Sequence, residues 1–241
     1  MSAKRRQQKN AQAGAKNMKT FYVLLAVVAV VGIGAIVYSM NRTTAGMATA
    51  PVELSMSSAD SLLQTARGVT MGSEDAPVRV IVFSDFQCGG CGAWANRIEP
   101  NLKAEFIDTG KVHYTRYDFP LVSIHPHAFL AARAARCAED QDLFWEYHDI
   151  MFANQGAWMY SQSAPVDQFT QYATEAGLNA EEFTGCLRSD RHADVVTANA
   201  LLAEQLGVNS TPTVYVGQRR LGNEWQDYDA VRAVIQAAGG V

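Results

Sequence analysis

The chain has 241 residues, of which 48% are hydrophobic and 18% are charged, and its formal net charge is −4 at pH 7. This composition is typical of a globular protein, so most of the chain should bury a core. Six of the 20 Lys and Arg residues lie in the first 20 positions, which leaves 14 basic residues against 24 acidic ones in the remainder. An acidic body argues against nucleic acid as a partner, because phosphate binding requires a basic surface.

The basic tail, residues 1–20, is followed by an uncharged apolar segment, FYVLLAVVAVVGIGAIVYSM, at residues 21–40. A helix of roughly 20 apolar residues is long enough to cross ~30 Å of hydrocarbon. Because the positive charges precede this segment, the positive-inside rule predicts a cytoplasmic N-terminus and an extracytoplasmic body. The sequence therefore predicts a single-pass protein of the cell membrane, held by an N-terminal anchor.

A cleaved signal peptide is the alternative, since Ala48-Thr49-Ala50 resembles a cleavage site. The apolar segment is longer than the ~7–15 residues of a signal-peptide core, which favours an uncleaved anchor. In either case the body is exported. Outside the cytoplasm thiols are not kept reduced, so the four cysteines of the chain favour disulfide chemistry.

The body shows strand patterns at both of its ends and helical patterns between them. Residues 41–68 are small and polar and predict a stalk or linker. Residues 69–125 hold a buried strand at 78–83, a helix after Cys91 with a kink at Pro100, and a second strand at 112–117. Residues 126–206 have helical spacing throughout.

The final segment, residues 207–241, returns to strands. It predicts a strand at 213–216, a tight turn at Gly217-Gln218 and a closing helix at 228–238. The order is β-α-β, an all-helical block, and then β-β-α.

Cys88 and Cys91 form the most informative motif, Cys-Gly-Gly-Cys. A zinc site needs four ligands, and the other two cysteines stand singly; His125 and His127 are more typical of a helix start than of a metal site. A structural disulfide is disfavoured too, because closing so short a loop removes little chain entropy. The remaining interpretation of the motif is a redox-active dithiol.

The position of this pair suits thiol–disulfide exchange. The motif follows a buried strand and opens a helix, so the helix N-terminus would stabilise a Cys88 thiolate. The thiolate is the nucleophile, and Cys91, one turn further on, could resolve a mixed disulfide. Pro212 begins a later strand, where it is either an ordinary trans proline or a cis proline that aims the Thr211 backbone at a substrate.

From Val69 to Val241 the chain resembles the membrane-anchored DsbA-like thiol–disulfide oxidoreductases. The resemblance rests on FSDFQCGGCG, the DFPL stretch, HPHAFLAARAARCAED, LFWEYHDIMFANQ and LGVNSTPTVYVGQRRL. It implies an α/β fold, namely a thioredoxin fold with an inserted helical domain, here preceded by one transmembrane helix. It also implies that Cys88 attacks, that Cys91 resolves, and that Thr211 and Pro212 form a cis-proline loop.

The chain departs from the family pattern in two respects. Relatives often have Pro after the first cysteine, and strongly oxidising ones have His before the second; this chain has Gly89 and Gly90 there, so we expect a milder oxidant. Relatives also commonly place a buried acid six residues before the first cysteine, where this chain has Val82. Asp85 is the nearest carboxylate, either as a proton relay or as a solvated turn residue.

Cys137 and Cys186 lie in two helical patterns of the insertion. They could be two buried free thiols. The export of the chain, together with the bond that some relatives carry, favours a structural disulfide between them. In the chain-entropy model such a bond stabilises the fold by ~4 kcal/mol.

We therefore predict an extracytoplasmic oxidoreductase that introduces disulfides into reduced, unfolded exported proteins. The resemblance implies a quinone-linked membrane reoxidase, of the DsbB or VKOR type, as a partner, and no bound cofactor or metal. A reductase or isomerase fed by a membrane electron donor is the alternative. From another class, a non-catalytic holding chaperone would keep its activity without Cys88.

Overall fold

The computed structural model describes residue 32 and residues 46–54 and 59–239. The chain divides into two units, Met1–Ala45 and Gly46–Val241, and the second contains the folded domain. The basic tail and the predicted anchor at residues 21–40 lie outside the described residues, Gly32 excepted. In the part that the structure describes, no helix has both the length and the apolar character to cross a membrane.

The domain is built on a sheet of five strands in the order β1-β3-β2-β4-β5. β2 and β3 are parallel, whereas the pairs β1–β3, β2–β4 and β4–β5 are antiparallel. The strands are β1 (Val69–Met71), β2 (Val78–Ser84), β3 (Val112–Asp118), β4 (Thr213–Val216) and β5 (Arg219–Arg220). The two strands predicted before the helical block thus become the paired centre of the sheet, and the predicted hairpin turn at Gly217 joins β4 to β5.

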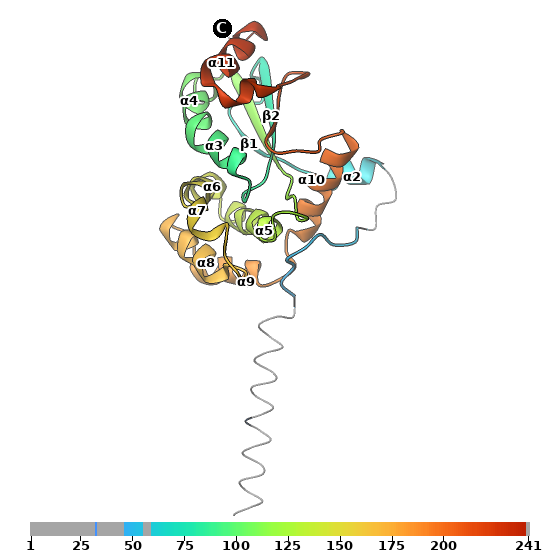
Figure 1. Cartoon of the computed structure of the whole chain (residues 1–241), viewed down its shortest axis with the longest axis vertical. Coiled ribbons are helices and arrows are strands. Elements are labelled where there is room, and N and C mark those ends of the chain that lie inside the picture. Colours follow the sequence, from blue (N-terminus) through green and yellow to red (C-terminus); the bar gives the residue numbers. More distant parts are fainter. Residues whose placement is uncertain (1–31, 33–45, 55–58, 240–241) are drawn as a thin grey trace, which may run out of the picture. The chain divides into compact units, whose positions relative to one another are not determined.

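Helices cover both faces of this sheet (Figure 1). On one face, the valines of β2 and Tyr114 of β3 form a core with α3 (Gly89–Arg97), α4 (Glu99–Leu102) and α11 (Tyr228–Ala237). On the other face, Phe83 of β2 packs with Ala203 of α10 (Ala193–Gln205). Because β2 is buried on both faces, its nearly continuous apolar sequence has a direct structural reason.

The helix after Cys91 breaks where the sequence places Pro100. α3 ends at Arg97, and Pro100 lies in the first turn of α4, where a missing N–H leaves no hydrogen bond unmade. A single π-helical turn, η1 (Lys103–Ile107), then leads toward β3.

The helical block lies beside the sheet and has its own core (Figure 1). Its central helix, α5 (Ala128–Glu139), is buried over almost its whole length, because six alanines let neighbouring helices approach closely. A disulfide joins Cys137 of α5 to Cys186 of α9 (Ala180–Leu187). The remaining helices are α6 (Phe144–Ala153), α7 (Gln155–Trp158), α8 (Val166–Glu175) and, near the C-terminus, the 3-10 turn η2 (Asn223–Gln226).

The sequence predicts a stalk at residues 41–68, and its described part, residues 46–54 and 59–68, contacts the domain at several points. Arg133 donates to the backbone oxygen of Ala48 at 2.7 Å, and the Val52 N–H donates to Thr197 Oγ1 at 3.1 Å. Leu62 of α2 (Ala59–Thr65) is buried beside Ala198 of α10. The apolar side chains of this segment therefore extend the domain core, which is why it packs instead of standing free.

Candidate active site

Cys88 and Cys91 lie where the central strand β2 passes into helix α3. Cys88 is the N-cap residue of α3, and its backbone N–H donates to the Asp85 carbonyl at 3.1 Å, which closes the turn between strand and helix. Cys91 lies in the first turn of α3 and is completely buried, whereas Cys88 is only half-buried. A partner can therefore reach the Cys88 thiol directly, whereas it can reach the Cys91 thiol only through Cys88.

The surroundings of Cys88 favour a thiolate. They lower the pKa of this thiol to about 5, chiefly through a hydrogen bond from the Cys91 thiol. Burial opposes this shift, while the Thr211 side chain and the backbone N–H groups of Cys91 and Gly90 contribute to it. These N–H groups belong to the unsatisfied first turn of α3, so the helix start acts on the sulfur as the sequence predicts.

Cys91 behaves in the opposite way. Complete burial raises the pKa of its thiol well above the ordinary value, and the hydrogen bond to Cys88 and the charge of Cys88 raise it further. Its Sγ accepts a hydrogen bond from the Asp85 backbone N–H at 3.3 Å. At neutral pH the pair therefore holds one thiolate, on Cys88, and one proton, on Cys91.

The loop before β4 reaches the same sulfur from a segment distant in sequence. The Cys88 thiol donates to the Thr211 carbonyl at 3.3 Å, and the Thr211–Pro212 peptide bond is cis. The Thr211 hydroxyl is buried at this loop. A Cβ atom at Gly90 would lie 3.1 Å from Pro212 and 3.3 Å from the Trp225 ring, so this loop packs closely on the motif.

Asp85, the candidate relay, is buried and not solvated, with 1% of its surface exposed. Its Oδ1 accepts from the Gln87 N–H at 2.7 Å, and its Oδ2 accepts from the Leu121 N–H at 2.9 Å. Oδ2 also lies 2.7 Å from Nδ1 of His125. The hydrogen bond from Asp85 to Cys91 comes from its backbone N–H, while its carboxylate orders the turn and holds His125.

Several residues that sequence reasoning missed support this site. Gln155, at the start of α7, donates to the carbonyls of Phe86 and Cys88 at 2.8 and 2.9 Å. The Gln87 side chain accepts from the His127 N–H at 2.7 Å. A glutamine has no distinctive spacing, and these contacts bridge segments tens of residues apart, so the sequence carries no pattern that could have revealed them.

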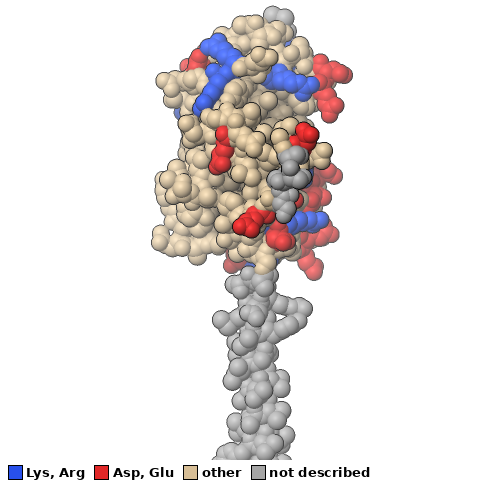
Figure 2. All heavy atoms as spheres, turned by 90° about the vertical axis from the view of Figure 1, so that its right-hand side faces the viewer, with Lys and Arg blue, Asp and Glu red and all other residues tan. Residues whose placement is uncertain are grey.

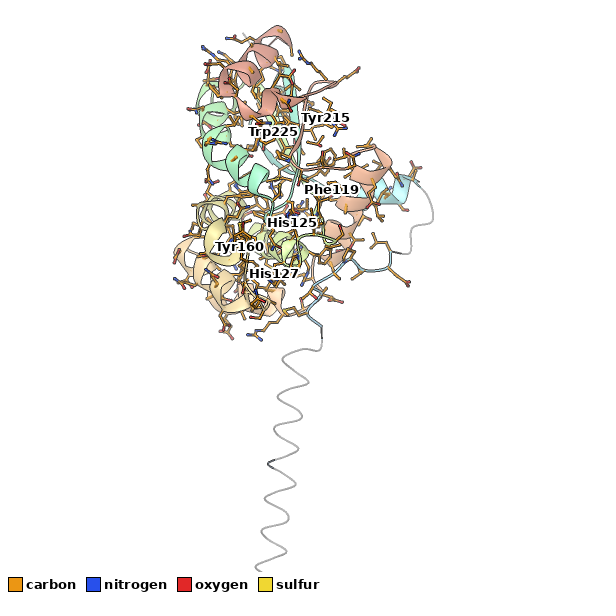
Figure 3. All side chains as sticks on the ribbon, in the orientation of Figure 1. Phe119, His125, His127, Tyr160, Tyr215 and Trp225 are labelled. Carbon is orange, nitrogen blue, oxygen red and sulfur yellow. A yellow bond between two sulfur atoms is a disulfide. The ribbon has the colours of Figure 1, made fainter. Side chains whose placement is uncertain are left out.

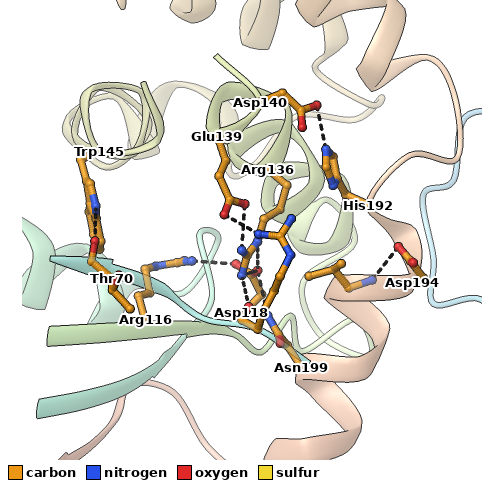
Figure 4. Close-up of polar contacts among 12 residues, drawn as sticks. Thr70, Arg116, Asp118, Arg136, Glu139, Asp140, Trp145, His192, Asp194 and Asn199 are labelled. Atoms are coloured by element: carbon orange, nitrogen blue, oxygen red, sulfur yellow. Dashed lines mark hydrogen bonds and ion pairs between the residues drawn. The ribbon is translucent and has the colours of Figure 1, made fainter. Parts of the chain in front are cut away.

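A buried charge network lies beneath the site (Figure 4). Asp118, at the end of β3, pairs with Arg116 and Arg136, each at 2.7 Å, and all three side chains are fully buried. Burial alone would raise the pKa of the Asp118 carboxyl, but the two arginines, Arg136 foremost, hold it below its usual range. The guanidinium of Arg116 stacks on the ring of Phe86 at 4.1 Å, which links this network to the turn that carries Cys88.

One group of side chains in the described part of the chain has ligand types that could suit a metal ion: Cys137, Cys186 and His192, whose ligating atoms lie within 4.8 Å of one another. Both sulfurs are bonded to each other, so neither is available as a thiolate ligand. His192 instead pairs with Asp140 at 2.9 Å (Figure 4). This cluster therefore stabilises the α5–α9 junction.

A strand-to-helix dithiol, opposed by a cis-proline loop and flanked by a helical block, defines a thioredoxin-fold thiol–disulfide exchange site. The sequence profile of the Thioredoxin family matches residues 64–237. The chain is 31% identical over 172 residues to the probable disulfide bond formation protein D of Bacillus cereus, covering 69% of this chain and 76% of the relative. It therefore belongs to the DsbA-like thiol–disulfide oxidoreductases of the thioredoxin superfamily.

A solved structure agrees with this assignment. The crystal structure of oxidised BdbD from Bacillus subtilis superposes with a TM-score of 0.64 at 25% identity, covering 72% of this chain and 96% of that one. The chain is also 32% identical over 167 residues to the Na(+)/H(+) antiporter NhaA 3 of Salinispora tropica. That match covers 69% of this chain but only 24% of the antiporter, so the chain spans about a quarter of that relative's length.

Proposed function

We propose that this protein introduces disulfide bonds into exported proteins through Cys88 and Cys91. The observation that best supports this proposal is the environment of Cys88, which lowers the pKa of its thiol to about 5. A thiolate exists only in the reduced form of the pair, so every interaction that stabilises it favours reduction of the pair and oxidation of the substrate. A value near 5 lies between the ~7 of thioredoxin and the ~3.5 of strongly oxidising DsbA.

The reaction proceeds in two exchanges, starting from the Cys88–Cys91 disulfide. A substrate thiolate attacks Sγ of Cys88; a substrate–Cys88 disulfide forms, the Cys88–Cys91 bond breaks, and Cys91 leaves and takes up a proton. The second substrate thiolate then attacks the substrate sulfur of the mixed disulfide, and Cys88 leaves as a thiolate. The substrate loses two electrons and the dithiol gains them.

The burial of Cys91 supports this division of roles. A substrate can reach the half-buried Cys88 but not Cys91, which has no exposed surface. The Thr211 carbonyl beside Cys88 can accept a hydrogen bond from an extended substrate segment once the thiol proton is gone. Thr211 and Pro212 thus form the substrate-facing wall of the site. Asp85 serves as a positioning residue there, because its carboxylate is occupied by Gln87, Leu121 and His125.

The cycle requires a partner that removes two electrons from the reduced pair. We propose a quinone-linked membrane reoxidase of the DsbB or VKOR kind, with residues 21–40 as the anchor that keeps both proteins at one membrane and the catalytic domain outside. The face shown in Figure 2 is not a continuous basic surface, because its Lys and Arg side chains lie in separate groups with Asp and Glu among them. This arrangement suits protein partners and not nucleic acid.

The reduction potential of the pair tests this proposal. Equilibration of the full-length protein with glutathione should give a potential between the ~−270 mV of thioredoxin and the ~−120 mV of DsbA. A potential at or below that of thioredoxin would instead mark a reductase or isomerase fed by an electron donor. Cys88→Ser should abolish the oxidation of a reduced substrate protein; a variant that retained full activity would indicate a holding chaperone.

A further inference from the structure

The Cys-Gly-Gly-Cys motif itself brings no positive charge to Cys88, yet one titratable cation lies close by. His125 belongs to the loop between β3 and α5, and its Nδ1 is 2.7 Å from Oδ2 of Asp85. The Asp85 carboxylate is fully buried and is held by the N–H groups of Gln87 and Leu121. The imidazole is therefore fixed in one orientation, with 21% of its side chain exposed to solvent.

This imidazole lines a hollow beside the turn that carries Cys88. His125 lines a hollow of about 590 Å³ together with Gln87, His127 and Tyr160, and Gln87 is the residue directly before Cys88. Figure 3 shows His125 and His127 close to Tyr160, below the start of α3. Asp85 raises the pKa of His125 above the ordinary value although burial opposes it, and the Cys88 charge raises it further. The interaction between the two charges is reciprocal, so a protonated His125 also stabilises the Cys88 thiolate.

We propose that His125, held by Asp85, supplies to the Cys88 thiolate the positive charge that the two glycines of the motif lack, and thereby makes the oxidising power of the pair depend on pH. This inference rests on the proposed function and deepens it. Asp85 acts as the positioning residue, because its carboxylate holds the imidazole at 2.7 Å.

The ionisable groups around His125 come from several elements of the domain. Asp85 comes from the turn after β2, Cys88 from the start of α3, His127 from the start of α5 and Tyr160 from the segment after α7. The ring of His127 is engaged elsewhere, with Nε2 2.8 Å from the Ser161 carbonyl. Between about 5, where Cys88 ionises, and the raised pKa of His125, thiolate and imidazolium coexist. Above that interval the imidazole is neutral and its contribution disappears.

The test compares four full-length proteins: wild type, His125→Gln, His125→Lys and the matched control His127→Gln. Each is equilibrated with glutathione across pH, and the rate of Cys88 alkylation by iodoacetamide is measured across the same range. For His125→Gln at about pH 6, we expect the equilibrium to shift toward the protein disulfide by roughly three- to tenfold. The difference should vanish at alkaline pH. His125→Lys should keep the oxidising power but lose this part of its pH dependence, and His127→Gln should match the wild type.

An equilibrium constant and alkylation profile for His125→Gln that match the wild type in mildly acidic solution would overturn this inference while leaving the proposed function intact. A wild-type protein that exchanges no electrons with glutathione would instead overturn the proposed function. Should His125→Gln fail to fold, His125→Lys and Asp85→Asn still decide the question. Asp85→Asn keeps the side-chain oxygen that accepts from Gln87, and it should move the pH-dependent step to lower pH.

Discussion

Val82 of β2 lies directly beside Arg116 of β3 in the parallel register of the sheet. Position 82 is where DsbA-like proteins commonly carry a buried acid, and here the arginine next to it takes its counter-ion from its own strand, Asp118, at 2.7 Å. Two nitrogens of Arg116, Nε and Nη2, have no hydrogen-bond partner among the described residues. In this chain the buried carboxylate that pairs with Arg116 thus belongs to β3, whereas β2 has Val82 at the neighbouring register position.

Asp118 should consequently be among the most sensitive positions of the core. Among the described residues, Asp118→Asn leaves the buried Arg116 without a counter-charge and leaves Arg136 with Glu139 alone, and we expect it to lower the free energy of unfolding by about 3–5 kcal/mol. Urea unfolding measures this. The matched control is Asp108→Asn, which breaks the exposed pair with Lys103 and should change the free energy by ~0–1 kcal/mol. Equal effects of the two substitutions would contradict a special role for the buried network.

The contribution of the Asp118 carboxylate to the free energy of unfolding should also depend on pH. Because the folded state lowers the pKa of Asp118, its stabilising contribution is complete above the pKa of the unfolded chain and is lost as the pH falls through the lower folded value. The wild type should therefore lose more stability on acidification than Asp118→Asn does. Urea unfolding at several acidic pH values measures this difference, and parallel losses in the two proteins would count against it.

The Cys88 thiolate predicts a distinct pH profile of alkylation. In the reduced wild-type protein, the rate of reaction with iodoacetamide should rise to half its plateau at a pH of about 5, while buried Cys91 stays unmodified. Mass spectrometry of the alkylated peptides distinguishes the two thiols. Replacing Cys91 by Ala removes the largest cause of the low pKa, so the midpoint should move upward. A midpoint near the ordinary cysteine value of ~8.5 would contradict the proposed environment.

Much of this architecture could be predicted from the sequence because it is local. The apolar run of β2, the helix that follows Cys91 and the helical spacing after Pro126 each depend on neighbours within one or two turns. Cys88 at the helix start follows from the same local order. The pairing of β2 with β3 also follows from a parallel strand-helix-strand unit.

The support around Cys88 could not be predicted in the same way. The contact between Asp85 and His125 spans 40 residues, and the contacts of Gln155 with the Phe86 and Cys88 carbonyls span 69 and 67. Each needs the helical block to be docked on the sheet before the groups meet. Asp85 was expected as a solvated turn residue or a relay, and its burial under the loop before α5 depends on the same docking.

The Cys137–Cys186 disulfide should stabilise the helical block without affecting the redox site. It closes a sequence separation of 49 residues between α5 and α9. In the chain-entropy model, the free energy of unfolding of the double variant Cys137→Ser/Cys186→Ser should be about 4 kcal/mol lower than that of the wild type. Its Cys88 alkylation profile should remain that of the wild type. A shifted profile in a folded double variant would show that this bond, too, acts on the active site.

Replacement by alanine should affect the stability and reactivity of the protein differently at the two glycines of the motif. A Cβ atom at Gly89 meets no atom within 4 Å, whereas one at Gly90 would lie 3.1 Å from Pro212, 3.3 Å from Trp225 and 3.7 Å from the Cys88 sulfur. Both positions are helical, so alanine gains roughly 0.4–1 kcal/mol at each by restricting the unfolded chain. At Gly90 the contacts with the loop offset this gain, because the loop and the ring must move to accommodate the methyl group.

We therefore expect Gly89→Ala to stabilise the protein and to exchange with glutathione at the wild-type rate. Gly90→Ala should be no more stable than the wild type and should react severalfold more slowly, because its methyl group narrows the approach to Cys88 beside Pro212. Urea unfolding and stopped-flow reduction of the two variants measure these effects side by side. Gly90→Ala could instead prove as stable as Gly89→Ala and exchange with glutathione at the same rate. The Trp225 ring would then move aside with little loss of stability, and the close packing of the cis-proline loop on the motif would not limit substrate access.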